Sequence, residues 1–164
     1  MLRRWKIPGA IEQQNFYTCA RPGRSKGKMG QVDNALVNKW ALNLPGVPST
    51  TIVSLLGRKP LAKDQSEFAF YAFCGGWDTP KERGGKPTFQ QWLELNHPTL
   101  KLEIVEHPTQ DYAPIPAETL TAIEKDVNRH LDAGRTVVLV DSGGVQRSGQ
   151  VCGHLGLVED SRTL

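Results

Sequence analysis

Hydrophobic residues recur at two different spacings along the chain, and each spacing predicts a kind of element. Apolar positions three and four residues apart are typical of a helix face, and they predict helices over 31–44 and 116–133. Short β-branched runs are typical of buried strands, and they occupy 51–56 and 136–140. Alternation of apolar and polar residues predicts a further strand over 100–105.

Capping residues, prolines and glycines delimit the remaining elements. Shorter helices are expected over 64–73 and 89–95, another from about Ser148, and short extended pieces over 7–22. Loops are expected over 22–30, 75–86 and 106–115. Because strands alternate with helices, the chain is predicted to be one α/β domain over 1–164, with a central, mainly parallel β-sheet flanked by helices.

Composition and charge add few constraints to this prediction. The chain has 164 residues, of which 23% are charged and 38% hydrophobic, as in an ordinary globular domain. No apolar stretch is long enough to span a bilayer, and no apolar signal core follows the basic N-terminus. A cytoplasmic protein with no membrane partner is therefore expected, and we expect it to be a monomer.

The net charge of +3 is too small to indicate nucleic-acid binding, and no such partner is expected. Basic residues do gather early in the chain. They are either a solvated surface or a basic rim that attracts a phosphorylated or acidic partner. The early basic residues are Arg3, Arg4, Lys6, Arg21, Arg24, Lys26 and Lys28.

The cysteines and histidines do not suggest a disulfide framework or a metal site. Three cysteines are an odd, sparse set, and no Cys or His group has the spacing of zinc ligands. Solvated or hydrogen-bonded structural roles are expected for His97, His107, His130 and His154. No metal and no cofactor are expected.

The segment 136–149 carries the clearest chemistry. A buried strand leads into a turn where Gly143 and Gly144 let the backbone curl without a Cβ in the way. Such a turn points successive N–H groups at one spot, and the N-terminus of a following helix adds positive potential. Arg147 supplies a bidentate fork. Together these residues predict an oxyanion cradle sized for phosphate or sulfate.

This segment resembles the signature loop Cys-x5-Arg-Ser/Thr of cysteine-dependent protein phosphatases of the dual-specificity kind. The five residues 142–146 separate Asp141 from Arg147, as in the family's cysteine-to-arginine spacing. Ser148 matches the hydroxyl that follows the arginine, and Gly144 and Gly149 stand where the family has glycine.

The resemblance implies a protein tyrosine/dual-specificity phosphatase fold and the hydrolysis of phosphate monoesters. In the family a thiolate attacks phosphorus, an acid protonates the leaving oxygen, and water then hydrolyses the phosphoenzyme. The implied substrates are phosphotyrosine and/or phosphoserine/threonine in a protein, or a small phosphorylated molecule. The implied phosphate-binding residues are Ser142, Gly143, Gly144, Val145, Gln146 and Arg147.

The family's general acid lies on an earlier loop, and Asp111 occupies the matching place. It stands in a proline-flanked loop between a predicted strand and the long predicted helix. The close match runs over 104–149, and a weaker one reaches back to Trp5. A turn-stabilising role is the alternative for Asp111. The neighbouring Tyr112 is either at the mouth of the pocket or outside it.

Three departures from the family pattern bear on activity. Asp141 replaces the nucleophilic cysteine, so the chain is predicted to be inactive or impaired by on the order of 10^4-fold or more. Val140 replaces the usual histidine, and the short tail 148–164 is consistent with a C-terminal truncation. The chain is therefore either an engineered inactive form of an enzyme or a natural pseudophosphatase that binds phosphorylated partners without catalysis.

Other readings of the sequence are weaker. The spacing from Cys19 to Arg24 is one residue short, so Cys19 is not expected to act as a nucleophile. Cys152 is expected in the core, with a redox partnership in an active enzyme as the alternative. A nucleotide-binding P-loop is disfavoured because Gln150 and Val151 stand where lysine and a hydroxyl residue are required. A core position is expected for Cys74, and Trp77 and Trp92 are expected to be core or loop anchors rather than substrate platforms.

Overall fold

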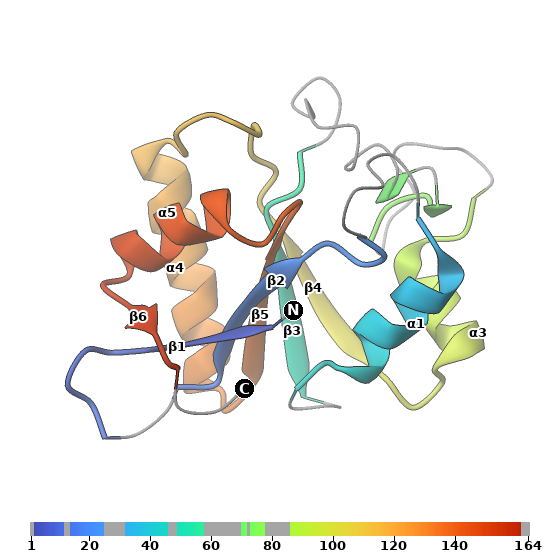
Figure 1. Cartoon of the computed structure of the whole chain (residues 1–164), viewed down its shortest axis with the longest axis horizontal. Coiled ribbons are helices and arrows are strands. Elements are labelled where there is room, and N and C mark those ends of the chain that lie inside the picture. Colours follow the sequence, from blue (N-terminus) through green and yellow to red (C-terminus); the bar gives the residue numbers. More distant parts are fainter. Residues whose placement is uncertain are drawn as a thin grey trace.

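The structure is a computed structural model, and it describes residues 2–11, 14–24, 32–45, 49–57, 70–71, 73–77 and 86–161. Within these ranges the protein is α/β, with a sheet between two layers of helices (Figure 1). None of the helices in this part of the chain has the length and apolar character that crossing a membrane requires.

The described strands form a six-stranded mixed sheet in the order β4-β3-β5-β2-β1-β6. The strands are β1 (Arg3–Lys6), β2 (Phe16–Ala20), β3 (Thr50–Ser54), β4 (Leu102–Glu106), β5 (Thr136–Asp141) and β6 (Val158–Glu159). The four strands from β4 to β2 run parallel, whereas β1 is antiparallel to both of its neighbours. The coarse α/β prediction is therefore confirmed.

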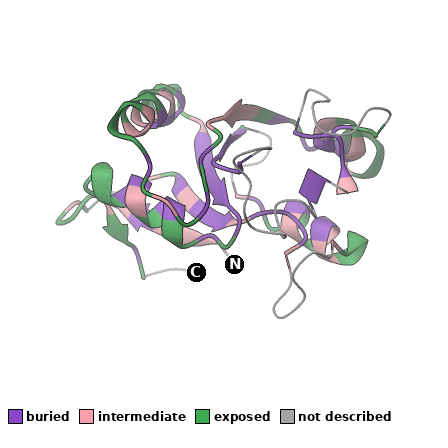
Figure 2. Ribbon diagram, turned by 90° about the horizontal axis from the view of Figure 1, so that it is seen from above, coloured by how far each residue is buried: buried purple, intermediate pink, exposed green. Residues whose placement is uncertain are grey.

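In the described part of the chain, two pairs of helices cover the two faces of the sheet (Figures 1 and 2). The helices are α1 (Asn34–Leu42), α3 (Phe89–Asn96), α4 (Ala117–Asp132) and α5 (Gln146–His154). One core lies under α1 and α3 and is rich in aromatic side chains, whereas the other lies under α4 and α5 and is mainly aliphatic. Burial on both faces explains the continuous apolar runs of β3 and β5.

The strand register brings the ends of three strands together. Ala20 at the end of β2 lies opposite Asp141 at the end of β5, and Ser54 of β3 lies opposite Val140. Because these strands are parallel, their carboxyl ends share one edge of the sheet. Ligands of open α/β sheets bind at this edge. The turn after β5, which was predicted to be the candidate site, lies there.

Most predicted elements have counterparts within two or three residues of the predicted ends. Gly134, expected to end the long helix, adopts a φ of +79° just beyond α4. Helix α5 begins at Gln146, slightly earlier than the predicted start near Ser148. The residues of the preceding turn gave no clear signal for where the helix begins. The predicted helix over 64–73 and loop over 75–86 lie largely outside the described residues. The short strands β1 and β6 were not predicted, because strands of four and two residues are too short to show a clear hydrophobic periodicity.

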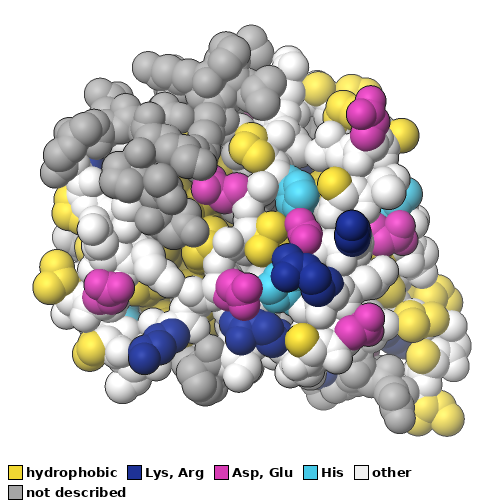
Figure 3. Space-filling model, turned by 180° about the vertical axis from the view of Figure 1, so that it is seen from behind, with side chains coloured by type: hydrophobic (Ala, Val, Ile, Leu, Met, Phe, Trp, Pro, Cys, Tyr) yellow, Lys and Arg dark blue, Asp and Glu magenta, His cyan; other side chains and the backbone are white. Residues whose placement is uncertain are grey.

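The outer surface carries charges of both signs. On the face seen in Figure 3, the described basic, acidic and histidine side chains lie next to one another. Asp126 pairs with His107 at 2.6 Å and with Arg129 at 3.1 Å, and Arg135 lies 3.4 Å from Glu103. The four histidines have hydrogen-bond or ion-pair contacts of this structural kind. Within the described residues, no group of three or more His, Cys, Asp or Glu side chains has a metal-binding arrangement.

Candidate functional site

The turn between β5 and α5 depends on a glycine that packs against β2. Gly144 has a φ of +76°, a conformation that other residues rarely adopt. A Cβ at this position would lie 2.6 Å from the backbone nitrogen of Ala20 and 2.7 Å from the carbonyl carbon of Cys19. Both the backbone conformation and the close approach to β2 therefore require glycine here.

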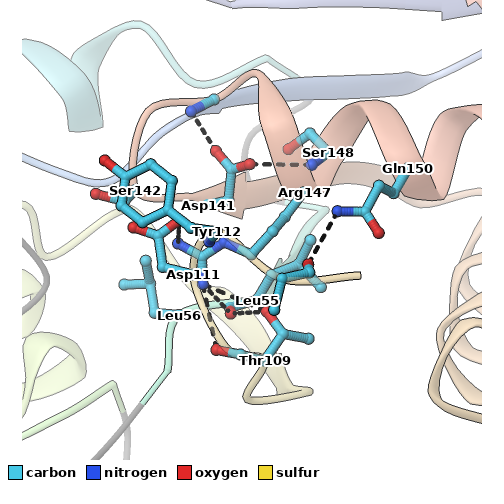
Figure 4. Close-up of polar contacts among 12 residues, drawn as sticks. Leu55, Leu56, Thr109, Asp111, Tyr112, Asp141, Ser142, Arg147, Ser148 and Gln150 are labelled. Carbon is cyan, nitrogen blue, oxygen red and sulfur yellow. Dashed lines mark hydrogen bonds and ion pairs between the residues drawn. The ribbon is translucent and has the colours of Figure 1, made fainter. Parts of the chain in front are cut away.

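The side chain of Asp141 lies inside the turn. It is only 2% exposed, and its two oxygens accept hydrogen bonds from the chain that follows (Figure 4). Oδ1 accepts from the amide of Gly144, and Oδ2 accepts from the amide of Ser148 at 2.9 Å. The carboxylate thus occupies two backbone donors of its own turn and stabilises the turn's curvature.

Other backbone amides of the turn are left without an acceptor among the described residues. In the described part of the chain, the amides of Gly143, Val145 and Gln146 donate to no other group. All three residues are exposed, and Gln146 is the first residue of α5. The N-terminus of α5 adds partial positive charge at the same place. These amides form the donor set that an external anion can reach.

The guanidinium of Arg147 extends from α5 to the segments that follow β3 and β4 (Figure 4). Its Nη1 donates to the carbonyl of Leu55 at 3.0 Å and to the carbonyl and hydroxyl of Thr109, both at 3.3 Å. Its Nη2 lies 3.5 Å from Oδ1 of Asp111. Arg147 is 1% exposed, so it ties three segments together at the end of the sheet. Its predicted role as an anion-binding fork stays a prediction.

Asp111 is 6% exposed and lies beside Arg147, so the structure brings the predicted general acid and the predicted anion-binding arginine together. Its Oδ1 accepts from the amide of Tyr112 at 3.0 Å. Tyr112 has a φ of 57°, and its side chain is 73% exposed. The sharp turn at Tyr112 buries the carboxylate while the aromatic ring projects into solvent.

Three residues of this site were not expected from the sequence. Leu55 and Thr109 hold Arg147, and Thr109 also donates from its hydroxyl to the Leu55 carbonyl at 2.7 Å. Gln150 on α5 donates to the carbonyl of Ala113 at 3.2 Å and accepts from the amide of Ile115 at 2.8 Å. Gln150 therefore clamps the Asp111 loop to α5. No local pattern marks these contacts, because each joins segments far apart in the chain.

Ser148 and Arg24 complete the surroundings of the turn. Ser148 is fully buried, and its Oγ has no hydrogen-bond partner among the described residues. Arg24 donates from Nη1 to Oγ of Ser142 at 3.0 Å, which places a cation beside the turn. Arg21 is 1% exposed, so it does not belong to a surface rim. Lys26 and Lys28 lie outside the described residues.

The cysteines are poor candidates for a nucleophile that would replace the missing one. Cys19, Cys74 and Cys152 are all buried free thiols. Burial raises the pKa of each thiol to about 12, so almost none is in the thiolate form near neutral pH. Cys152 lies in the core beneath α5 as expected, and Trp77 is fully buried in the aromatic core.

The fold and the site together define an α/β protein with a glycine-dependent turn at the carboxyl edge of a mixed sheet. Comparison of the chain with protein-family models, curated proteins and solved structures found no match. The function of this chain is therefore inferred from its own residues and their geometry.

Proposed function

We propose that this chain is a phosphatase-like protein that binds the phosphate group of a phosphorylated partner at the turn 141–147 without hydrolysing it. The observation that carries the proposal is the position of Asp141. Its carboxylate accepts from the amides of Gly144 and Ser148, at the position where the cysteine-dependent phosphatases that this segment resembles have a thiolate. The turn therefore keeps the form of an anion cradle and lacks the group that attacks phosphorus.

Anion binding is supported by the donors that Asp141 leaves available. The amides of Gly143, Val145 and Gln146 belong to exposed residues and donate to no described group. The N-terminus of α5 and the guanidinium of Arg24 add positive potential next to them. A phosphate monoester, which is a compact dianion with several acceptor oxygens, suits this set of donors.

The proposed lack of hydrolysis is supported by the hydrogen bonds of the Asp141 carboxylate. Both oxygens of Asp141 are held by the turn's own amides, so neither faces an external phosphorus atom. The carboxylate also repels an incoming dianion, which weakens binding without preventing it. The three thiols are buried, and their pKa values of about 12 keep them protonated.

A second candidate function is phosphate monoester hydrolysis: in this case the chain is a hydrolase whose nucleophile has been replaced. The proximity of Asp111 to Arg147, at 3.5 Å, favours this alternative, because an acid and an arginine next to the turn serve phosphate monoester hydrolysis. The two candidates differ in what a thiol at position 141 would do.

Binding can be tested by titrating ¹⁵N-labelled protein with phenyl phosphate. We expect shifts of the amides of residues 142–147, and about tenfold tighter binding by Asp141→Ser, because that change removes a negative charge. Glu118→Gln removes an exposed carboxylate on α4 and serves as the matched control, with unchanged affinity expected. If neither the wild type nor Asp141→Ser shows shifts at the turn, the proposal is wrong.

Catalysis can be tested with para-nitrophenyl phosphate. The wild type should not exceed the background rate, and measurable turnover by it would contradict the proposal. Turnover by folded Asp141→Cys would favour the hydrolase scaffold, whereas an inactive but phosphate-binding Asp141→Cys would favour the pure binding protein. Circular dichroism checks that the variant is folded.

A further inference from the structure

A cavity of about 310 Å³ lies next to the turn 141–147, between the carboxyl end of β2 and helix α1. This volume is at the small end of the range for ligand pockets. Its walls include the side chains Arg24, Leu36, Lys39, Trp40 and Asn43. The proposed phosphate-binding turn does not by itself account for this cavity.

One face of α1 builds the helical wall of the cavity. Leu36, Lys39, Trp40 and Asn43 are three and four residues apart, so they lie on the same side of the helix. The indole Nε1 of Trp40 donates to the carbonyl of Ala20 at 3.1 Å. This bond attaches α1 to the last residue of β2 and gives the cavity a wall at the sheet's carboxyl edge.

Arg24 joins the cavity to the turn. It lines the cavity, and its Nη1 donates to Oγ of Ser142 at 3.0 Å. The same nitrogen lies 3.5 Å from the position of a Cβ built on Gly143. In addition, the amide of Arg21 donates to the carbonyl of Ser142 at 3.4 Å. A ligand that extends from the turn past Arg24 therefore enters the cavity.

The charge of the cavity wall favours an anion. Arg21, Arg24 and Lys39 contribute to the wall, and none of the described residues that line the cavity is acidic. The amine of Lys39 is exposed and has no ion pair among the described residues. The side-chain amide of Asn43 likewise has no hydrogen bond there, so both groups are available to a ligand.

We infer that the cavity binds a second anionic group of the same ligand, so that the protein recognises small molecules carrying two phosphate groups. This inference rests on the proposed function, because the first phosphate group is the one at the turn. Lys39 and Asn43 hold the second phosphate group, and Arg24 lies between the two. Phosphate groups attract these donors more strongly than neutral hydroxyls do.

Calorimetric titration with matched sugar and glycerate phosphates tests the inference. The probes are fructose 1,6-bisphosphate against fructose 6-phosphate, and 2,3-bisphosphoglycerate against 3-phosphoglycerate. For at least one pair, the wild type should bind the bisphosphate about fivefold more tightly. Lys39→Met should remove this preference and leave the affinity for the monophosphate unchanged. The control Lys125→Met removes an exposed lysine from α4, on the opposite face of the sheet, and should change neither affinity.

The outcomes separate this inference from the proposed function. Equal affinities for the bisphosphate and the monophosphate within both pairs would overturn the cavity assignment. Equal losses of bisphosphate affinity in Lys39→Met and Lys125→Met would also overturn it. In both cases monophosphate binding at the turn would still stand. Failure of all four probes and of phenyl phosphate to bind would overturn the proposed function and, with it, this inference. Bisphosphate binding that depends on Lys39 but does not change in Asp141→Ser would also overturn it, because the two groups would then not share one ligand.

Discussion

Two residues of the turn, Asp141 and Gly144, depend on each other. The carboxylate of Asp141 accepts from the amide of Gly144, and the left-handed conformation of Gly144 brings that amide to the carboxylate. The backbone of Ala20 and Cys19 leaves no space for a side chain at Gly144. A side chain at position 144 would therefore change both the shape of the turn and its contact with β2.

Substitution of two glycines in this region tests how far the turn depends on glycine. Gly144→Ala should lower the free energy of unfolding by about 2 kcal/mol or more, because it combines an unfavourable φ with a backbone clash. Gly149→Ala is the matched control, because a Cβ in this position of α5 has no atom within 4 Å. It should stabilise the protein by about 0.5–1 kcal/mol. Urea unfolding followed by circular dichroism measures both, and equal effects of the two changes would contradict the argument.

Helix α4 is anchored to the sheet by a buried polar network. Arg135 donates from Nε to the hydroxyl oxygen of Thr51 at 2.7 Å, and the same hydroxyl forms a hydrogen bond of 3.0 Å with Nδ1 of His130. Burial lowers the pKa of His130 below its ordinary value of 6.5, despite Glu103 at 3.8 Å.

This network predicts a pH dependence of stability. Because the pKa of His130 is lower in the folded than in the unfolded chain, the unfolded chain binds the proton first as the pH falls. The contribution of His130 is thus fully present above about pH 6.5 and is lost as the pH falls through the folded pKa. Free energies of unfolding at several pH values between 7.5 and 5 should fall more steeply for the wild type than for His130→Gln. Parallel curves for the two proteins would show that His130 does not carry the effect.

At the scale of the whole molecule, the described residues form one sheet with separate cores on its two faces. Cys19 and Cys74 lie in the core beneath α1 and α3, and Cys152 lies in the core beneath α4 and α5. Both cores exclude water from these thiols, and this exclusion raises each thiol pKa to about 12. Thiol reactivity therefore reports on the integrity of each face.

A thiol reagent tests this description of the two cores. In native protein at pH 8, the aromatic disulfide DTNB should react with none of the three cysteines over minutes, and in concentrated urea it should react with all three. The absorbance of the released thiol counts the reacted groups. Rapid reaction of any one cysteine in the native protein, located by peptide mapping, would show that its core is open.

The sequence predicted the helices and strands well where local patterns were strong. The apolar spacing of α4 and the β-branched run of β5 can be recognised without knowing which segments pack against them, and Gly134 marks the end of α4. The predicted site residues Asp111 and Arg147 do lie together. The contacts of Arg147 with Leu55 and Thr109, in contrast, have no local signal.

The chain's own order of residues is enough to establish an alternating α/β pattern and a glycine-containing turn after a buried strand, since both follow from side-chain spacing and backbone conformation within a few residues. The order of the strands, the antiparallel direction of β1, the inward position of the Asp141 carboxylate and the cavity beside α1 were decided only by the tertiary structure. These features arise from packing between segments that are distant in the chain, and no short stretch of sequence contains the partners on both sides.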